Sequence, residues 1–137
     1  MKINTYSNIF DRLAAVLLAP QNVMAYEQMT YKEARRYSDY TGGIWKITTI
    51  EGYEGQFMYP QGNDRYKVAV DTNGYEGEMS NVAFGLFCSI CAYEDLMDIA
   101  HEQNLDSLAL KLKTEFDKIM NIIYDHEEGV ELVRALD

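Results

Sequence analysis

The sequence predicts an α+β fold: one domain over residues 1–137, with a small antiparallel meander of three or four strands packed with N-terminal and C-terminal helices. Three observations carry this prediction. The length of 137 residues is that of one ordinary domain. Apolar residues recur at helical spacing near both ends of the chain. Between residues 44 and 79 the chain is instead rich in β-branched and aromatic residues and punctuated by glycine, which favours short strands.

Two helices are expected in the N-terminal part. Ser7 or Asn8 can cap the first, which must stop before Pro20 because proline cannot continue the helical hydrogen-bond ladder. Its apolar face consists of Ile9, Leu13, Val16 and Leu17. The second helix is expected from about Val23 to Ser38, and the glycine pair at 42–43 then ends the regular pattern.

Four strands are expected in the middle of the chain. They are Ile44–Ile50, Gln56–Tyr59, Tyr66–Asp71 and Tyr75–Met79. Their connections are too short for parallel crossovers, so neighbouring strands should be antiparallel. The dipeptide Asn73-Gly74 predicts a type I′ hairpin turn, in which both central residues need positive φ. Gly77 in the last strand indicates a bulge or the close approach of another element.

The C-terminal part reads as three helical segments. Ser80 or Asn81 can cap the first, whose residues Val82–Ile90 are apolar on nearly every side, so it should be the most buried helix. Asn104 or Asp106 can start the next. Its apolar stripe is Leu108, Leu112, Phe116, Ile119 and Ile123. Gly129 separates a short terminal segment, residues 130–136.

The composition excludes several classes of protein. Twelve basic against 22 acidic residues give a net charge of -10, which disfavours direct binding to nucleic acid or to anionic membranes. No signal-peptide pattern follows Met1, and no apolar run approaches the roughly 20 residues of a membrane-spanning helix. The two cysteines are too few for a disulfide framework. The sequence therefore predicts a cytoplasmic protein.

Signals for catalysis are weak. Cys88 and Cys91 form a CxxC inside an apolar helix, where two buried core side chains are favoured over a redox pair. Asp98, His101 and Glu102 could share one helical turn as a metal site, but a solvated polar face is favoured there. His126 matches no catalytic pattern. We therefore expect no enzyme activity, no cofactor and no metal; the alternative is a small thiol or metal enzyme that uses the two cysteines.

One helical face carries regularly spaced negative charge. Glu94, Asp98 and Glu102 fall four residues apart, a rise of about 6 Å each, which is comparable with the phosphate spacing of a nucleic acid strand. This spacing permits phosphate mimicry, although an ordinary solvated face is favoured because acidic helix surfaces are common. We call these three residues the acidic edge.

Several ordered blocks carry a family resemblance. The first is Tyr40-Thr41-Gly42-Gly43-Ile44-Trp45, and the second is Gln56-Phe57-Met58-Tyr59-Pro60. The third is the hairpin Asn73-Gly74-Tyr75-Glu76-Gly77-Glu78-Met79-Ser80. The fourth is the tail with His126, Glu128, Arg134, Ala135 and Asp137. Together they resemble the antirestriction proteins of the ArdB/KlcA type, which are found on plasmids, phages and other mobile genetic elements; Gln56 and Glu127 depart from the family's usual Gly and Pro.

The resemblance implies a small α+β protein that protects incoming DNA by inhibiting a host type I restriction enzyme complex, through protein–protein contact and without catalysis. Such a protein needs no direct nucleic acid or membrane contact. A generic acidic adaptor of a mobile element is a further alternative.

The residues of these blocks have two alternative roles, packing in the fold or contact with a partner. Packing is favoured for Trp45, and also for Tyr40, Tyr59 and Tyr75, for which an exposed partner contact is the alternative. With the acidic edge, such tyrosines are the candidate contact residues. The two carboxylates of Asp137 are expected to meet an arginine and tether the tail, with Arg12, Arg35 and Arg134 as the candidates.

Overall fold

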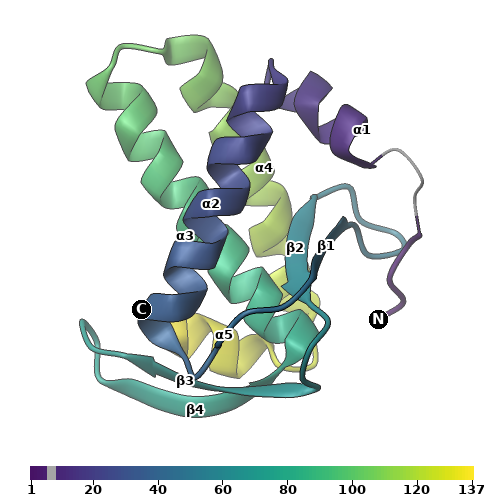
Figure 1. Cartoon of the computed structure of the whole chain (residues 1–137), viewed down its shortest axis with the longest axis vertical. Coiled ribbons are helices and arrows are strands. Elements are labelled where there is room, and N and C mark those ends of the chain that lie inside the picture. Colours follow the sequence, from purple (N-terminus) through teal and green to yellow (C-terminus); the bar gives the residue numbers. More distant parts are fainter. Residues whose placement is uncertain (6–8) are drawn as a thin grey trace.

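The computed structural model describes residues 1–5 and 9–137 and shows an α+β domain (Figure 1). Its helices are α1 (Ile9–Val16), α2 (Pro20–Tyr37), α3 (Asn81–Glu102), α4 (Asp106–Asp125) and α5 (Gly129–Leu136). Its strands are β1 (Trp45–Thr48), β2 (Phe57–Pro60), β3 (Arg65–Val70) and β4 (Tyr75–Ser80). The predicted cap at Ser7 or Asn8 lies outside the described residues. No helix in the described part of the chain is long and apolar enough to cross a bilayer.

The α+β class is confirmed, but the four strands do not form one meander. They form two separate antiparallel pairs, β1 with β2 and β3 with β4. Trp45 lies opposite Pro60 in the first pair and Arg65 lies opposite Ser80 in the second. Each ladder continues by one residue, because the Gln61 N–H donates to the Ile44 carbonyl and the Asn81 N–H donates to the Asp64 carbonyl. The loop of residues 61–64 therefore carries the chain from one strand pair to the other.

Helix α3 is the central element, as its apolar sequence predicted. It contacts both α2 and α4, crosses α2 in the view of Figure 1, and packs its N-terminal half on β2. The Ser80 hydroxyl caps it by accepting the Ala83 N–H at 3.2 Å. Contact with β2 is close, because a Cβ added at Gly85 would lie 2.6 Å from the Tyr59 Cα. In the core, the rings of Tyr26 and Tyr93 stack with centroids 4.4 Å apart.

The β3–β4 turn differs from the predicted type I′ geometry. Four residues, 71–74, separate the paired Val70 and Tyr75, and only Gly74 in this loop has positive φ, at 76°. Asn73 instead uses its side chain, whose Oδ1 accepts the Tyr75 N–H at 2.9 Å. Gly77 pairs regularly with Val68, so there is no bulge, and the close approach is that of Tyr75, whose Cζ would lie 2.8 Å from an added Cβ.

Other boundaries shift by a few residues for local reasons. Helix α2 begins at Pro20 rather than Val23, because proline at the first helical position loses no hydrogen bond. The first predicted strand is interrupted after Thr48, and Ile50 instead bridges Ile3 at the N-terminus. The tail helix includes Gly129 as its first residue.

Candidate functional site

The acidic edge is a continuous exposed face of α3. Glu94, Asp98 and Glu102 are all exposed, and no ion pair neutralises them among the residues that the structure describes. Partial burial, followed by the charges of Asp98 and Asp95, raises the pKa of Glu94. Helical spacing thus places the three carboxylates on one side of the molecule, as the sequence predicted.

Tyr40 and Trp45 form an aromatic cluster with Tyr31 of α2. Trp45 Nε1 donates a hydrogen bond to Tyr40 Oη at 3.0 Å, and the two rings meet edge to face with centroids 5.5 Å apart. The Tyr31 ring stands at 65° to the indole, with centroids 5.6 Å apart. All three residues are half-buried, so the cluster anchors the start of β1 to α2 while leaving part of each ring at the surface.

Packing, the favoured interpretation of Tyr75, is confirmed, whereas the alternative of an exposed partner contact at this residue is wrong. Its exposed fraction is 6%, because it lies on the face of β4 that packs inward. Its hydroxyl donates to Glu131 Oε2 at 2.7 Å, and burial, then that hydrogen bond, raises the pKa of Tyr75 to about 12. Tyr59 is half-buried. Tyr75 is therefore a packing residue in this structure.

Two of the blocks that carry the family resemblance pack on each other. The β3–β4 hairpin meets the tail at both of its ends: Asn73 Nδ2 donates to the Ala135 carbonyl at 2.8 Å, and the Ser80 N–H donates to Glu128 Oε1 at 2.9 Å. The Ser80 hydroxyl donates to the other Glu128 oxygen. Residues far apart in the sequence thus build one local structure.

The predicted tether through Asp137 is wrong. Asp137 is exposed, and within the described residues no arginine nitrogen lies within 4.0 Å of its carboxylates. Arg134 pairs instead with Glu131 at 3.4 Å, three residues away on α5. The tail is held instead by its hydrogen bonds to Asn73 and Ser80 of the hairpin. Matching opposite charges in the sequence could not predict these contacts.

The cysteines sit in the interior of the α3 packing. Cys88 is buried, Cys91 is half-buried, and both are free thiols. Burial raises the pKa of each thiol well above its usual range, with further contributions from nearby groups such as the Glu33 carboxylate. The nucleophilic thiolate is therefore disfavoured near neutral pH.

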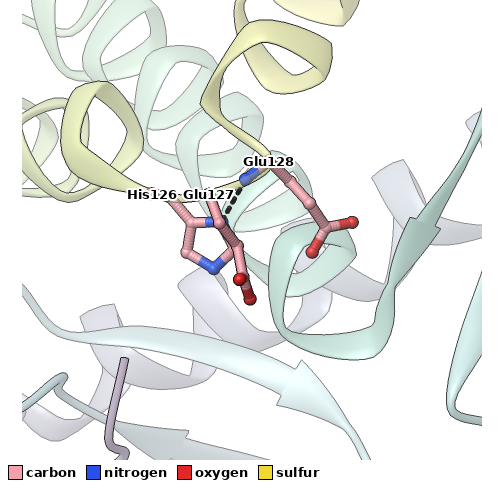
Figure 2. A group of neighbouring side chains, drawn as sticks. All are labelled: His126, Glu127 and Glu128. Carbon is pink, nitrogen blue, oxygen red and sulfur yellow. Dashed lines mark hydrogen bonds between the residues drawn. The ribbon is translucent and has the colours of Figure 1, made fainter.

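The structure brings together a different group of possible metal ligands from the one that the sequence suggested. In the described part of the chain, Asp98, His101 and Glu102 do not bring three donor atoms together, whereas His126, Glu127 and Glu128 place theirs within 4.8 Å of one another (Figure 2). His126 Nδ1 accepts the Glu128 N–H at 3.0 Å, and burial lowers the pKa of His126. Both Glu128 oxygens already accept from Ser80. The hydrogen bonds of this cluster therefore stabilise the turn before α5.

Two buried carboxylates were not foreseen. Glu115 of α4 is 1% exposed; it pairs with Lys118 Nζ at 3.3 Å and accepts the Gln56 N–H at 3.2 Å. Glu33 of α2 is 3% exposed, and burial together with the Asp95 carboxyl raises the pKa of Glu33 to about 8. In sequence both residues stand among charged neighbours that face solvent, so no local signal distinguishes them.

Comparisons with known proteins agree with this architecture. Residues 38–137 match the family model described as antirestriction protein, a span that contains all four blocks. Two Escherichia coli proteins named antirestriction protein KlcA are each 28% identical to the chain, one over 99 residues and the other over 120. The first match covers 72% of this chain and 64% of the relative, which is less than two thirds of that relative's length. The second covers 86% of this chain and 81% of the relative.

A solved structure extends the similarity to nearly the whole chain. It comes from work on the KlcA and ArdB proteins, which describes a novel fold and antirestriction activity against type I DNA restriction systems in vivo but not in vitro. The TM-score is 0.80 at 25% identity, with 99% of this chain and 93% of that chain covered. Sequence blocks, their mutual packing and the overall fold lead to one conclusion: this chain belongs to the antirestriction protein family.

Proposed function

We propose that this protein inhibits a host type I restriction system, and so protects the DNA of a mobile element, by binding a protein of the restriction complex without catalysing a reaction. The proposal rests on the family match over residues 38–137 and on the TM-score of 0.80 to the solved structure from the work on KlcA and ArdB. The type I target comes from the activity described there for those relatives.

A binding role rather than a catalytic one is supported by the state of the reactive side chains. The thiols of Cys88 and Cys91 are held in their protonated form by burial. The two histidines are separated, with His101 exposed on α3 and His126 engaged in the turn before α5. These arrangements favour packing roles over an activated nucleophile.

The acidic edge is one candidate contact surface. It is exposed, and its three carboxylates form no ion pair with any residue that the structure describes, on a chain of net charge -10. A basic surface of the restriction complex, including one that ordinarily holds DNA, would be attracted to it. The edge supports either direct protein recognition or mimicry of DNA phosphates.

Plasmid transfer into a strain with an active type I system tests the function itself. Unmodified plasmid should enter more efficiently when the recipient makes this protein, and the gain should vanish in a recipient that lacks the restriction system. Equal transfer with and without the protein would contradict the proposal. Because the described relatives act in vivo but not in vitro, the cellular assay is the appropriate one.

Charge reversal separates the acidic edge from net charge. Changing its three residues to lysine should abolish protection if the edge is the contact. The matched control reverses three other exposed acids, Asp64, Glu76 and Glu127, which changes the net charge by the same amount. Equal loss in both variants would show that total charge matters and the edge does not.

A further inference from the structure

A second surface feature lies beside the aromatic cluster, between α2 and β1. It is a cavity of about 490 Å³. Glu27 and Tyr31 line it from α2, Trp45 and Ile47 line it from β1, and Asn4 lines it from the N-terminal segment. The cavity is distinct from the acidic edge of α3 and has both polar and aromatic walls.

Glu27 is the unusual member of this cavity. It is half-buried, yet within the described residues its carboxylate has no ion pair and no hydrogen bond. Burial raises the pKa of Glu27, so the fold holds this carboxylate where its charged form is disfavoured. A partly desolvated charge without a partner costs stability, and an incoming cation would remove that cost.

The aromatic walls stand next to this carboxylate. Glu27 and Tyr31 are one helical turn apart and share a face of α2. The Tyr31 and Trp45 rings meet at 65°, which leaves a corner between a ring face and a ring edge. The hydrogen bond from Trp45 to Tyr40 holds the indole in this orientation. An aromatic corner beside a carboxylate is a favourable site for a cationic group.

We propose that the cavity formed by Glu27, Tyr31 and Trp45 binds the positively charged side chain of a lysine or arginine on a protein partner. The carboxylate pairs with the charge while the rings contact the cation and its aliphatic stem. That the partner belongs to a restriction complex rests on the proposed function, whereas the preference of the cavity for a cation does not.

Lys46 places a positive charge at the same cavity. It also lines the cavity, is exposed, and forms no ion pair with Glu27 in the described structure. Its ammonium group would compete with an incoming cation by like-charge repulsion. Removing it should therefore leave cation binding as strong or make it stronger.

Ligand binding in the cavity can be followed by tryptophan fluorescence, because Trp45 is the single tryptophan of the chain and lines the cavity. The probe is acetyl-arginine amide, and the matched control is acetyl-citrulline amide, which has a similar shape and no charge. The proposal predicts a saturable fluorescence change with the arginine probe and binding at least about fivefold weaker with citrulline.

Variants then assign the binding to the cavity. Glu27→Gln should weaken the arginine probe by about tenfold, since a charged hydrogen-bonded contact contributes roughly 1.5 kcal/mol or more. Lys46→Gln should bind at least as well as wild type, and Glu76→Gln, an exposed acid on β4, should bind equally. Because Glu27 pairs with none of residues 1–5 and 9–137, Glu27→Gln should not lower the thermal midpoint, whereas the same change at an acid that stabilises the fold would lower it.

The outcomes separate this proposal from the proposed function. Equal binding of arginine and citrulline, or no saturable change, would overturn the cation site. So would a stronger response to Mg²⁺ or to a nucleoside monophosphate, which would identify a metal or a base-stacking site. If the probe binds but the protein gives no protection in cells, only the proposed function fails. If the protein protects but the probe does not bind, only the cavity proposal fails.

Discussion

Ser80 and Glu128 join the end of the β3–β4 hairpin to the turn before α5. The Ser80 N–H donates to Glu128 Oε1 at 2.9 Å and its hydroxyl donates to the second carboxylate oxygen, while the same hydroxyl caps α3 by accepting from Ala83. One serine therefore connects a strand, the central helix and the tail. The pairing therefore couples the hairpin block to the tail block.

Removing Glu128 should destabilise this junction. Glu128→Ala leaves the Ser80 N–H without its acceptor, which we expect to lower the free energy of unfolding by about 1–3 kcal/mol. The neighbouring exposed Glu127→Ala is the control and should change it by less than about 0.5 kcal/mol. Urea unfolding measures both. Equal effects of the two variants would mean that the Ser80–Glu128 contact contributes little.

Gly85 should tolerate no side chain. Gly85→Ala puts a Cβ against the β2 backbone, 2.6 Å from the Tyr59 Cα, so α3 must move away from β2. We expect a net loss of about 1–3 kcal/mol, even though alanine is the better helix former by about 1 kcal/mol. Gly62→Ala, where the nearest atom to the added Cβ is 3.8 Å away, is the control. A thermal midpoint unchanged by Gly85→Ala would show that the contact can relax.

The cysteines should react only when the protein opens. Burial keeps both thiols protonated, so iodoacetamide at neutral pH should label the folded protein slowly and the urea-unfolded protein fast. Cys88, which is fully buried, should be slower than the half-buried Cys91. Mass spectrometry follows each site. Rapid labelling of the folded protein would instead favour the thiol-enzyme alternative.

Glu33 should make stability fall as pH rises. Burial, then the Asp95 carboxyl, raises the pKa of Glu33 from 4.5 to about 8, so between these values the folded state keeps a proton that the unfolded state has released. Stability linked to Glu33 is therefore present below pH 4.5 and is lost as the pH approaches 8. Lys32 and Arg36 offset part of the shift.

The variant Glu33→Gln mimics the protonated acid at every pH. Relative to wild type, it should gain about 1–3 kcal/mol of unfolding free energy at about pH 8.5 and little at about pH 5. The control, Glu76→Gln, alters an exposed acid and should show no such trend. A gain that is the same at both pH values would rule out titration of Glu33 as the cause.

Much of the fold could be predicted from local sequence. The apolar run of α3 and its Ser80 cap follow from helical periodicity and hydrogen-bonding chemistry, and both are confirmed. The separation into two sheets could not be predicted, because nothing in residues 61–64 signals that β2 and β3 remain unpaired. Strand propensity alone does not specify partners.

The candidate site shows the same division. The common face of the acidic edge follows from four-residue spacing on one helix, and its exposure follows from its three charged side chains. Tyr75 is hydrogen-bonded to Glu131, 56 residues away. Glu27, which pairs with no described residue, faces a cavity that β1 residues also line. Such long-range contacts leave no pattern in a single sequence.

Phage plating tests the central claim most directly. Unmodified phage should form plaques more efficiently on a type I restricting strain that makes this protein than on the same strain without it. Phage carrying the host's own modification should plate equally on both. Equal plating of unmodified phage, with the protein shown to accumulate in folded form, would contradict the account.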